Sequence, residues 1–194
     1  MNNSQKIKTI FFGTSLFALP SLEMLIRSEW TPVAVVTKPD EPAGRKQLLT
    51  PPPVKSYIVE RVTRNAEEKK IEILQPRKLD ANFAPHAARY APDVFIVAAY
   101  GKIIPKEILA IPRLGALNIH PSLLPRWRGP SPIQYAILHG DTETGVTIMQ
   151  MDEEMDHGPL VTNRVARIAN RRITYPELHD QLAKAAAELL IETL

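Results

Sequence analysis

Short apolar runs alternate along the chain with segments in which apolar residues recur at helical spacing. The apolar runs predict strands at residues 7–12, 33–37, 71–74, 93–100, 114–120, 145–151 and 160–168. The helical spacing predicts helices at 15–27, 54–69, 80–90 and 132–139, and a last helix after Thr174, where Glu177 completes a capping box. Strands alternating with helices favour an α/β fold, with a Rossmann-like open, mostly parallel twisted sheet and helices on both faces.

Details of the pattern refine this outline. Ser15 is a candidate helix cap, with Pro20 near the first turn of that helix. Residues 38–53 combine proline with charge and predict a long loop. Residues 160–168 alternate and predict a half-exposed strand. The last helix reaches Leu194 without a C-cap glycine or a proline, so we expect a fragment of a longer protein, with a natural terminus as the alternative.

Composition narrows the class of protein. The chain has 194 residues, 44% hydrophobic and 23% charged, which is typical of one folded domain, or one domain plus part of a second. Without cysteine it has no disulfide, thiolate metal ligand or cysteine nucleophile. We find no run of about 18 apolar residues and no signal-peptide pattern, so we expect a cytoplasmic protein without a membrane segment. The net charge of +3 and pI of 9.2 are too small a bias to establish nucleic-acid binding.

The strand that ends before Pro121 carries two polar side chains. Asn118 and His120 lie two residues apart, so they share one face of the strand at about 6.6 Å, while Leu117 and Ile119 point into the opposite layer. His120 then lies at the carboxyl edge of the sheet, where α/β proteins bind ligands. An amide donor beside an imidazole suits a developing oxyanion and a nearby proton transfer. A histidine that is only structural or exposed is the alternative.

An acidic stretch follows the next predicted strand. Residues 152–156 include four acids, and His157 comes directly after them. Because the stretch follows a strand, we expect it at the same carboxyl edge, where one acid could orient a histidine. A metal site is a rival interpretation, although no ligand spacing supports it, and a solvated acidic loop is another.

Glycine and basic residues point only weakly to phosphate binding. Residues 13–15 form a tight strand–helix turn that lacks the full dinucleotide motif. Residues 38–55 hold four basic and two acidic side chains. The arginines of 126–128, which flank a tryptophan, and those of 164–172 could contact phosphates or form solvated faces, and for 164–172 we favour the solvated face.

Several motifs together resemble those of a known family. They are NIHPSLLPRWRG at 118–129, GVTIMQMD at 145–152 with Asp156, and the stretches at 11–18, 37–45 and 97–105. On these residues the chain resembles the folate-dependent formyltransferases. The resemblance extends from Ile7 onward and implies that residues 1–194 form the family's N-terminal catalytic domain, without the smaller C-terminal β-barrel domain of full-length members.

The resemblance also implies a reaction. The family members most similar in these motifs transfer the formyl group of 10-formyltetrahydrofolate to the α-amino group of methionine on initiator tRNA. Asn118 would donate to the oxyanion, His120 would stabilise it and move the amine proton to the folate leaving group, and Asp156 would hold the imidazole and order a water. The resemblance implies no metal and no covalent enzyme intermediate.

Binding residues follow from the same resemblance. The expected folate-binding residues come from three segments: Tyr100, Ile103, Ile104, Ser122, Leu123, Leu124, Pro125, Met151, Asp152, Glu153 and Glu154. The expected tRNA-binding residues are Lys38, Arg45 and Lys46, with Arg45 entering the acceptor stem. We expect folate and initiator methionyl-tRNA as partners, no membrane, and a monomer.

Three alternatives stay open at this point. The acceptor could be another amine, on a nucleotide sugar or glycinamide ribonucleotide, which would make the Arg45 loop unimportant. Water could replace the amine, which would make a formyltetrahydrofolate hydrolase. A module that binds folate or RNA without chemistry would tolerate the loss of His120.

Overall fold

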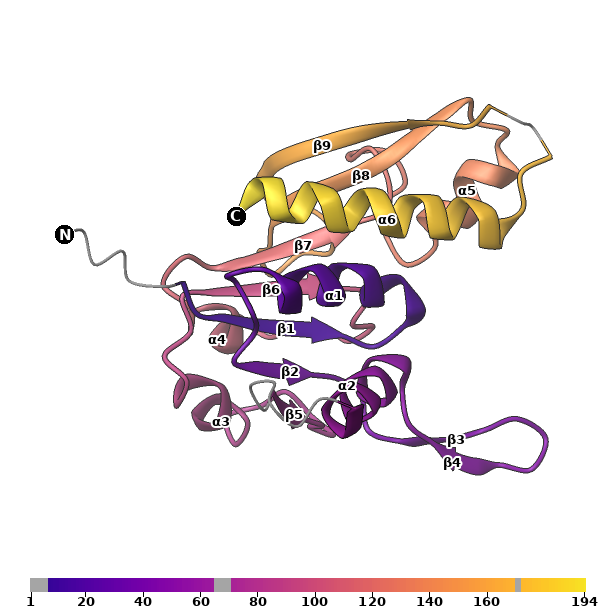
Figure 1. The fold of residues 1–194 in the computed structure, drawn as a ribbon. Helices are drawn as coiled ribbons and strands as arrows, with labels where there is room; N and C mark the ends of the chain where they lie inside the picture. The colour runs from indigo at the N-terminus through magenta and orange to yellow at the C-terminus, as the bar shows by residue number, and fades with distance from the viewer. Residues whose placement is uncertain (1–6, 65–70, 170–171) are drawn as a thin grey trace.

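The computed structural model describes residues 7–64, 71–169 and 172–194. Its main sheet has the strand order β5-β2-β1-β6-β7-β8-β9 (Figure 1). Those strands are β1 (Thr9–Gly13), β2 (Ala34–Val36), β5 (Glu72–Leu74), β6 (Val94–Ala98), β7 (Ala116–His120), β8 (Glu143–Gln150) and β9 (Leu160–Arg167). The helices are η1 (Leu16–Ala18, a 3-10 turn), α1 (Leu19–Arg27), α2 (Pro53–Arg64), α3 (Ala84–Ala88), α4 (Lys106–Leu109), α5 (Pro132–Leu138) and α6 (Tyr175–Thr193).

Strand direction divides the sheet into two parts. The strands from β5 to β7 pair in parallel, whereas β8 pairs antiparallel with both β7 and β9. The predicted α/β fold with a mostly parallel sheet is therefore confirmed. β7 lies at the boundary, with a parallel neighbour on one side and an antiparallel neighbour on the other.

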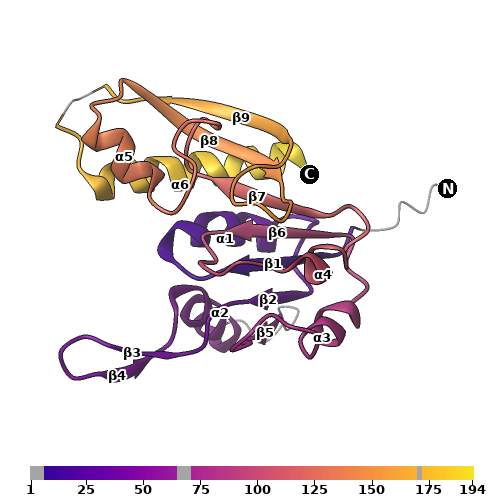
Figure 2. The same ribbon diagram turned by 180° about the vertical axis from the view of Figure 1, so that it is seen from behind.

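The sheet separates two apolar cores, because successive side chains of a strand point to opposite faces. Phe11 and Ile96 join the core under α1, α2 and α6, while Phe12 and Phe95 join the core under α3 and α4. Figures 1 and 2 show these helices in front of and behind the sheet. The long run in β6 is buried throughout, as expected of a strand covered on both faces.

The carboxyl edge of the parallel strands is flanked by two elements. The arrowheads of β2, β1, β6 and β7 point to the same side in Figure 1, and α5 and a projecting hairpin lie toward that side. The hairpin consists of β3 (Glu41–Ala43) and β4 (Leu48–Thr50), paired antiparallel.

That hairpin corrects the prediction of an irregular loop at residues 38–53. Its strands are exposed, so they lack the buried apolar positions from which a strand is predicted. Gly44 and Gln47, both with positive φ, close the turn between them, and the Gln47 amide donates to the Gly44 carbonyl.

Two helix predictions need adjustment, and one short helix was missed. The helix expected at 80–90 is limited to α3, because the Asp80 carboxylate accepts the backbone N–H groups of Asn82 and Phe83 and holds a turn there. Ser15 precedes the 3-10 turn η1 but makes no side-chain capping bond. The short helix α4 was not predicted. Residues 65–69 of the helix expected at 54–69 lie outside the described residues.

The capping box at the start of α6 is confirmed. The Glu177 carboxylate accepts hydrogen bonds from the backbone N–H and the hydroxyl of Thr174, at 2.8 and 2.7 Å. The strand predicted at residues 160–168 is confirmed as the edge strand β9, although it is mostly exposed and not half-exposed as predicted. In the part of the chain that the structure describes, we find no helix long and apolar enough to cross a membrane.

Candidate active site

Asn118 and His120 lie on one face of β7, as predicted. The preceding residue on that face, Ala116, belongs to the core under α3 and α4, whereas Leu117 and Ile119 pack into the opposite core. The apolar face thus turns polar toward the end of the strand. His120 is nevertheless only 5% exposed, so its ring nitrogens require partners within the protein.

Asp156 joins these two side chains. Its Oδ1 accepts a hydrogen bond from Asn118 Nδ2 at 3.2 Å and lies 3.5 Å from His120 Nδ1. Its Oδ2 accepts the backbone N–H of Gly129 at 2.8 Å. The Asp156 side chain is 11% exposed and its φ is +51°, so a fixed backbone presents a largely buried carboxylate to the amide and the imidazole. The structure therefore brings together the three residues predicted to be catalytic.

The route by which Asp156 arrives differs from the prediction. The acidic stretch was expected at the carboxyl edge, but β8 is antiparallel to β7, and its end pairs with the start of β7, Gln150 facing Leu117. The loop that follows must therefore return along β7 to reach Asn118. Figure 2 shows this loop between β8 and β9 lying beside β7. Apolar periodicity does not report strand direction, so the pattern of residues 143–150 does not predict the reversal.

The second nitrogen of the His120 ring is held by the segment after β7. Nε2 lies 3.0 Å from the carbonyl oxygen of Trp127. Trp127 has φ of +58°, which is unusual for a bulky residue. The imidazole is thus fixed between a carbonyl and a carboxylate.

Residues 122–125, which lie between His120 and Trp127 in the chain, form a closely bonded turn. The Ser122 hydroxyl is buried and donates to the carbonyl of Arg126 at 2.6 Å. Thr147 of β8, which faces His120 across the strands, donates to the Ser122 carbonyl and accepts from the Leu124 N–H. Sequence reasoning missed Thr147, although a polar residue inside a buried strand is a usable signal. Leu123 is half-buried, Leu124 is buried and Pro125 is exposed.

The residues predicted to bind folate in the loop after β6 differ in their exposure to solvent. Tyr100 packs its ring edge-on against Phe12 in the core, so its side chain is shielded from solvent, and this burial raises its pKa to about 12. Ile104 is buried as well, whereas Ile103 is 77% exposed. Of the three residues predicted in this loop to bind folate, Ile103 is the one whose side chain is exposed.

The loop after β8 is tied down at several points. Met151 packs against the core under α3 and α4, and Glu153 forms an ion pair with Lys106 at the start of α4. Asp152 bonds His157 at 2.8 Å and accepts the N–H of Glu154. The bond from Asp152 and the charge of Glu154 raise the pKa of His157 above its ordinary value.

The predicted tRNA-binding residues occupy two places. Arg45 and Lys46 are exposed in the turn of the hairpin. Lys38 lies instead beside the end of β6, where a Cβ built on Gly101 would be 2.9 Å from its Nζ. Asp40, at the base of the hairpin, accepts hydrogen bonds from Gln75 and Lys55, which lower its carboxyl pKa.

Two of the arginines considered for phosphate binding are engaged within the protein, while Arg171 lies outside the described residues. Arg126 forms a two-point ion pair with Asp141 and lies over the Trp127 ring at 4.4 Å. Arg164 pairs with Glu188 and Glu192 of α6. Both side chains therefore have a structural role in this conformation.

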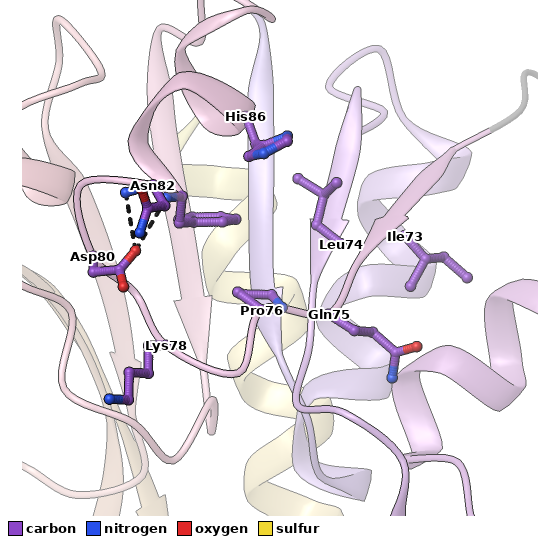
Figure 3. Close-up of a pocket in the computed structure, with 9 residues that line it drawn as sticks. Ile73, Leu74, Gln75, Pro76, Lys78, Asp80, Asn82 and His86 are labelled. Atoms are coloured by element: carbon purple, nitrogen blue, oxygen red, sulfur yellow. Dashed lines mark hydrogen bonds between the residues drawn. The ribbon is translucent and has the colours of Figure 1, made fainter.

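A pocket of about 330 Å³ lies away from these residues. It is formed beside the edge strand β5 and the turn before α3, where His86, Asn82 and Lys78 surround it (Figure 3). None of the predicted catalytic residues lines it. We find no group of three or more metal-ligating side chains within the described ranges.

Comparison with known proteins places this geometry in a family. The family model described as "Formyl transferase" matches residues 5–194. The chain belongs to the formyl transferase family. It is 46% identical over 187 residues to the methionyl-tRNA formyltransferase of Halorhodospira halophila, covering 96% of this chain and 57% of that protein. It is 44% identical over 189 residues to the same enzyme of Wolbachia pipientis, covering 97% and 60%. The chain thus spans somewhat less than two thirds of these curated relatives.

Solved structures support the family fold. Glycinamide ribonucleotide transformylase 1 from Symbiobacterium toebii superposes with a TM-score of 0.73 at 19% identity, over 96% of this chain and 84% of that one. A formyltetrahydrofolate deformylase from Pseudomonas syringae gives 0.72 at 19% identity, over 98% and 60%. At such low identities the formyl transferase fold is what these structures share with the chain.

Proposed function

We propose that this chain is a catalytic domain that transfers the formyl group of 10-formyltetrahydrofolate to the α-amino group of methionyl initiator tRNA. The observation that carries the proposal is the convergence of Asn118, His120 and Asp156 on one face of β7. The methionyl-tRNA formyltransferases at 43–46% identity support the choice of acceptor. Because the proposed acceptor is an initiator tRNA, which is used in the cytoplasm, we propose that the reaction takes place there.

The chemistry begins with attack of a neutral amine on the formyl carbon, which leaves negative charge on the formyl oxygen. A primary amide has two N–H donors, and Asn118 uses one of them on Asp156. The second N–H is then available to the oxyanion. One fixed donor of this kind contributes roughly 3–4 kcal/mol to the transition state.

His120 is assigned the proton transfer. The attacking amine must lose a proton, and the folate nitrogen must gain one as its bond to the formyl carbon breaks. The ring contacts Trp127 through Nε2 at 3.0 Å and Asp156 through Nδ1 at 3.5 Å. Because the Nδ1 contact is the looser one, we assign Nδ1 to receive and return the proton. Asp156 holds the ring and balances its positive charge.

The substrates would approach from two sides. The folate donor would lie along residues 122–125, the loop after β8 and the exposed Ile103 of the loop after β6. The tRNA would meet the exposed turn of the hairpin at Arg45 and Lys46, whose base is fixed through Asp40. No step in this scheme requires a metal ion.

The test is consumption of 10-formyltetrahydrofolate by this chain, with and without methionyl-tRNA. We expect consumption that requires the tRNA and is lost in His120→Ala. Asp180→Asn is a matched control, because Asp180 is exposed on α6 and bonds only the neighbouring His179 among the contacts described. Equal consumption without tRNA would indicate a hydrolase. Consumption with a nucleotide-sugar amine or glycinamide ribonucleotide, but not with tRNA, would change the acceptor.

A further inference from the structure

One contact of His120 is made by the main chain and not by a substrate-facing group. A carbonyl oxygen only accepts hydrogen bonds, so the 3.0 Å contact between Nε2 and the Trp127 carbonyl requires a proton on Nε2. The proton that changes place during catalysis is then the one on Nδ1. Nδ1 faces the Asp156 carboxylate at 3.5 Å, which also only accepts, so the two acceptors compete for the ring proton and the closer Trp127 carbonyl favours Nε2.

The backbone conformation that orients the Trp127 carbonyl is one that tryptophan does not favour. Its φ of +58° lies in the left-handed region, which aromatic residues avoid. Such a conformation persists only where surrounding contacts enforce it. The next question is which contacts do so.

The indole of Trp127 is half-buried and makes four described contacts. Its Nε1–H donates to Asp141 at 2.7 Å. Arg126 lies over the ring at 4.4 Å, and Tyr135 of α5 stacks on it nearly parallel at 5.5 Å. His139 adds a third ring contact, at 4.4 Å. With these groups against it, the ring is a structural support rather than an open stacking surface.

Asp141 is the centre of this arrangement. Its side chain is 8% exposed and accepts three hydrogen bonds, one from the indole and two from Arg126 at 3.1 and 2.5 Å. The bonds from Arg126 also hold its carboxyl pKa below the ordinary value, so the group is an anion at neutral pH. Asp141 touches neither His120 nor Asp156 in any described contact, and the side chains that it bonds are those of Trp127 and its neighbour Arg126.

We infer that Asp141 is a positioning residue that fixes the protonated nitrogen of His120, by holding Trp127 so that its carbonyl accepts the Nε2 proton. The connection runs from Asp141 to the indole, along the Trp127 backbone, and to the imidazole. This inference rests on the proposed formyl transfer, and it assigns a role to a residue other than Asn118, His120 and Asp156.

The decisive measurement is long-range 1H–15N NMR of the histidine rings, which distinguishes a protonated ring nitrogen from a bare one and needs no substrate. The chain has five histidines, and His120→Ala identifies the His120 signals. In the unchanged protein at neutral pH we expect Nε2 of His120 to give the shift of a protonated nitrogen. In Asp141→Asn we expect it to move toward the average of two exchanging forms.

Two further variants complete the test. Trp127→Phe keeps a stacked ring but removes the indole N–H, and should change the His120 signal in the same way. Asp180→Asn removes a carboxylate that bonds His179 at 2.8 Å, so it should alter only the His179 signal. In the formyl-transfer assay, Asp141→Asn should lower kcat about tenfold and leave the KM for the folate donor within twofold.

The results separate this inference from the proposed function. A His120 signal unchanged in a folded Asp141→Asn protein overturns the inference, whatever the activity. If both Asp141→Asn and Trp127→Phe fail to fold, judged by circular dichroism, Asp141 is a residue of the fold and the inference is also overturned. If the NMR signal changes as expected but no formyl transfer is found in the unchanged protein, the inference stands and the proposed function fails.

Discussion

Gly158 offers the sharpest test of how tightly the Asp156 loop must close. A Cβ built at this position would lie 2.0 Å from the Gln150 carbonyl oxygen and 3.4 Å from the Asp152 nitrogen. Both of these atoms belong to the backbone, so they cannot move aside as a flexible side chain could. Ordinary contact needs about 3.4 Å, so Gly158→Ala requires a displacement of about 1.4 Å. Asp156 is two residues away, and its carboxylate reaches Asn118 at 3.2 Å. The displacement is thus large enough to break that bond.

The expected effect has two parts. Misplacing a catalytic group by about 1 Å lowers the rate roughly 100-fold, so kcat/KM for formyl transfer should fall by about that factor. Overpacking of a tight backbone site destabilises by about 1–3 kcal/mol, which for a chain of this size lowers Tm by about 2–12 °C. Steady-state kinetics and a thermal melt measure the two effects separately.

Gly115→Ala provides the matched control. Gly115 has φ of +75°, so alanine is strained there too, but its Cβ would meet only the flexible end of the Gln150 side chain. It should lower Tm while leaving kcat/KM within about threefold. A folded Gly158→Ala protein with kcat/KM within threefold of the unchanged chain would refute the reasoning, since Asp156 would then tolerate the displacement.

Three other changes test separate parts of the scheme. Asn118→Ala should lower kcat by about 10²–10³ and, because it removes the bond to Asp156, lower Tm by a few degrees; a smaller loss of kcat would remove Asn118 as the oxyanion donor. Arg45→Ala should raise the KM for tRNA but not the KM for folate. It should also reduce the slope of log kcat/KM against log salt concentration by about one. An equal rise in both KM values would contradict the assignment of Arg45 to tRNA binding. The raised pKa of His157 means that its bond to Asp152 is strongest at low pH and is lost as pH rises through that pKa. An NMR titration should give a value above about 6.5 that falls in Asp152→Asn.

Much of the fold could be predicted because the buried strands carry their own signal. The continuous apolar run of β6 and the i, i+2 pairing of Asn118 with His120 depend only on local alternation, and both predictions are confirmed. The capping box at Thr174 is also local. Such features depend on neighbours within a few residues, which the sequence displays directly.

The features that sequence reasoning missed depend on contacts between distant residues. The β3–β4 hairpin has no buried face, so its positions give no apolar pattern. The reversal of β8 follows from pairing with β7, and no local property of residues 143–150 encodes it. Asp141 and Trp127 meet only because α5 returns the chain to the segment after β7. Motif reasoning considered residues 126–128 for phosphate binding and found no structural role for Asp141.

The position of β7 has a consequence for how the protein fails on heating. Asn118 and His120 belong to β7, which is hydrogen-bonded to a strand on each side, whereas Asp156 belongs to a loop. Backbone amides within a doubly paired strand exchange with solvent only through large openings, and loop amides exchange through small ones. The loop should therefore detach from β7 at temperatures where the sheet is still intact. We expect formyl transfer to disappear several degrees before the far-ultraviolet circular dichroism changes, with the amides of residues 152–157 the first to exchange.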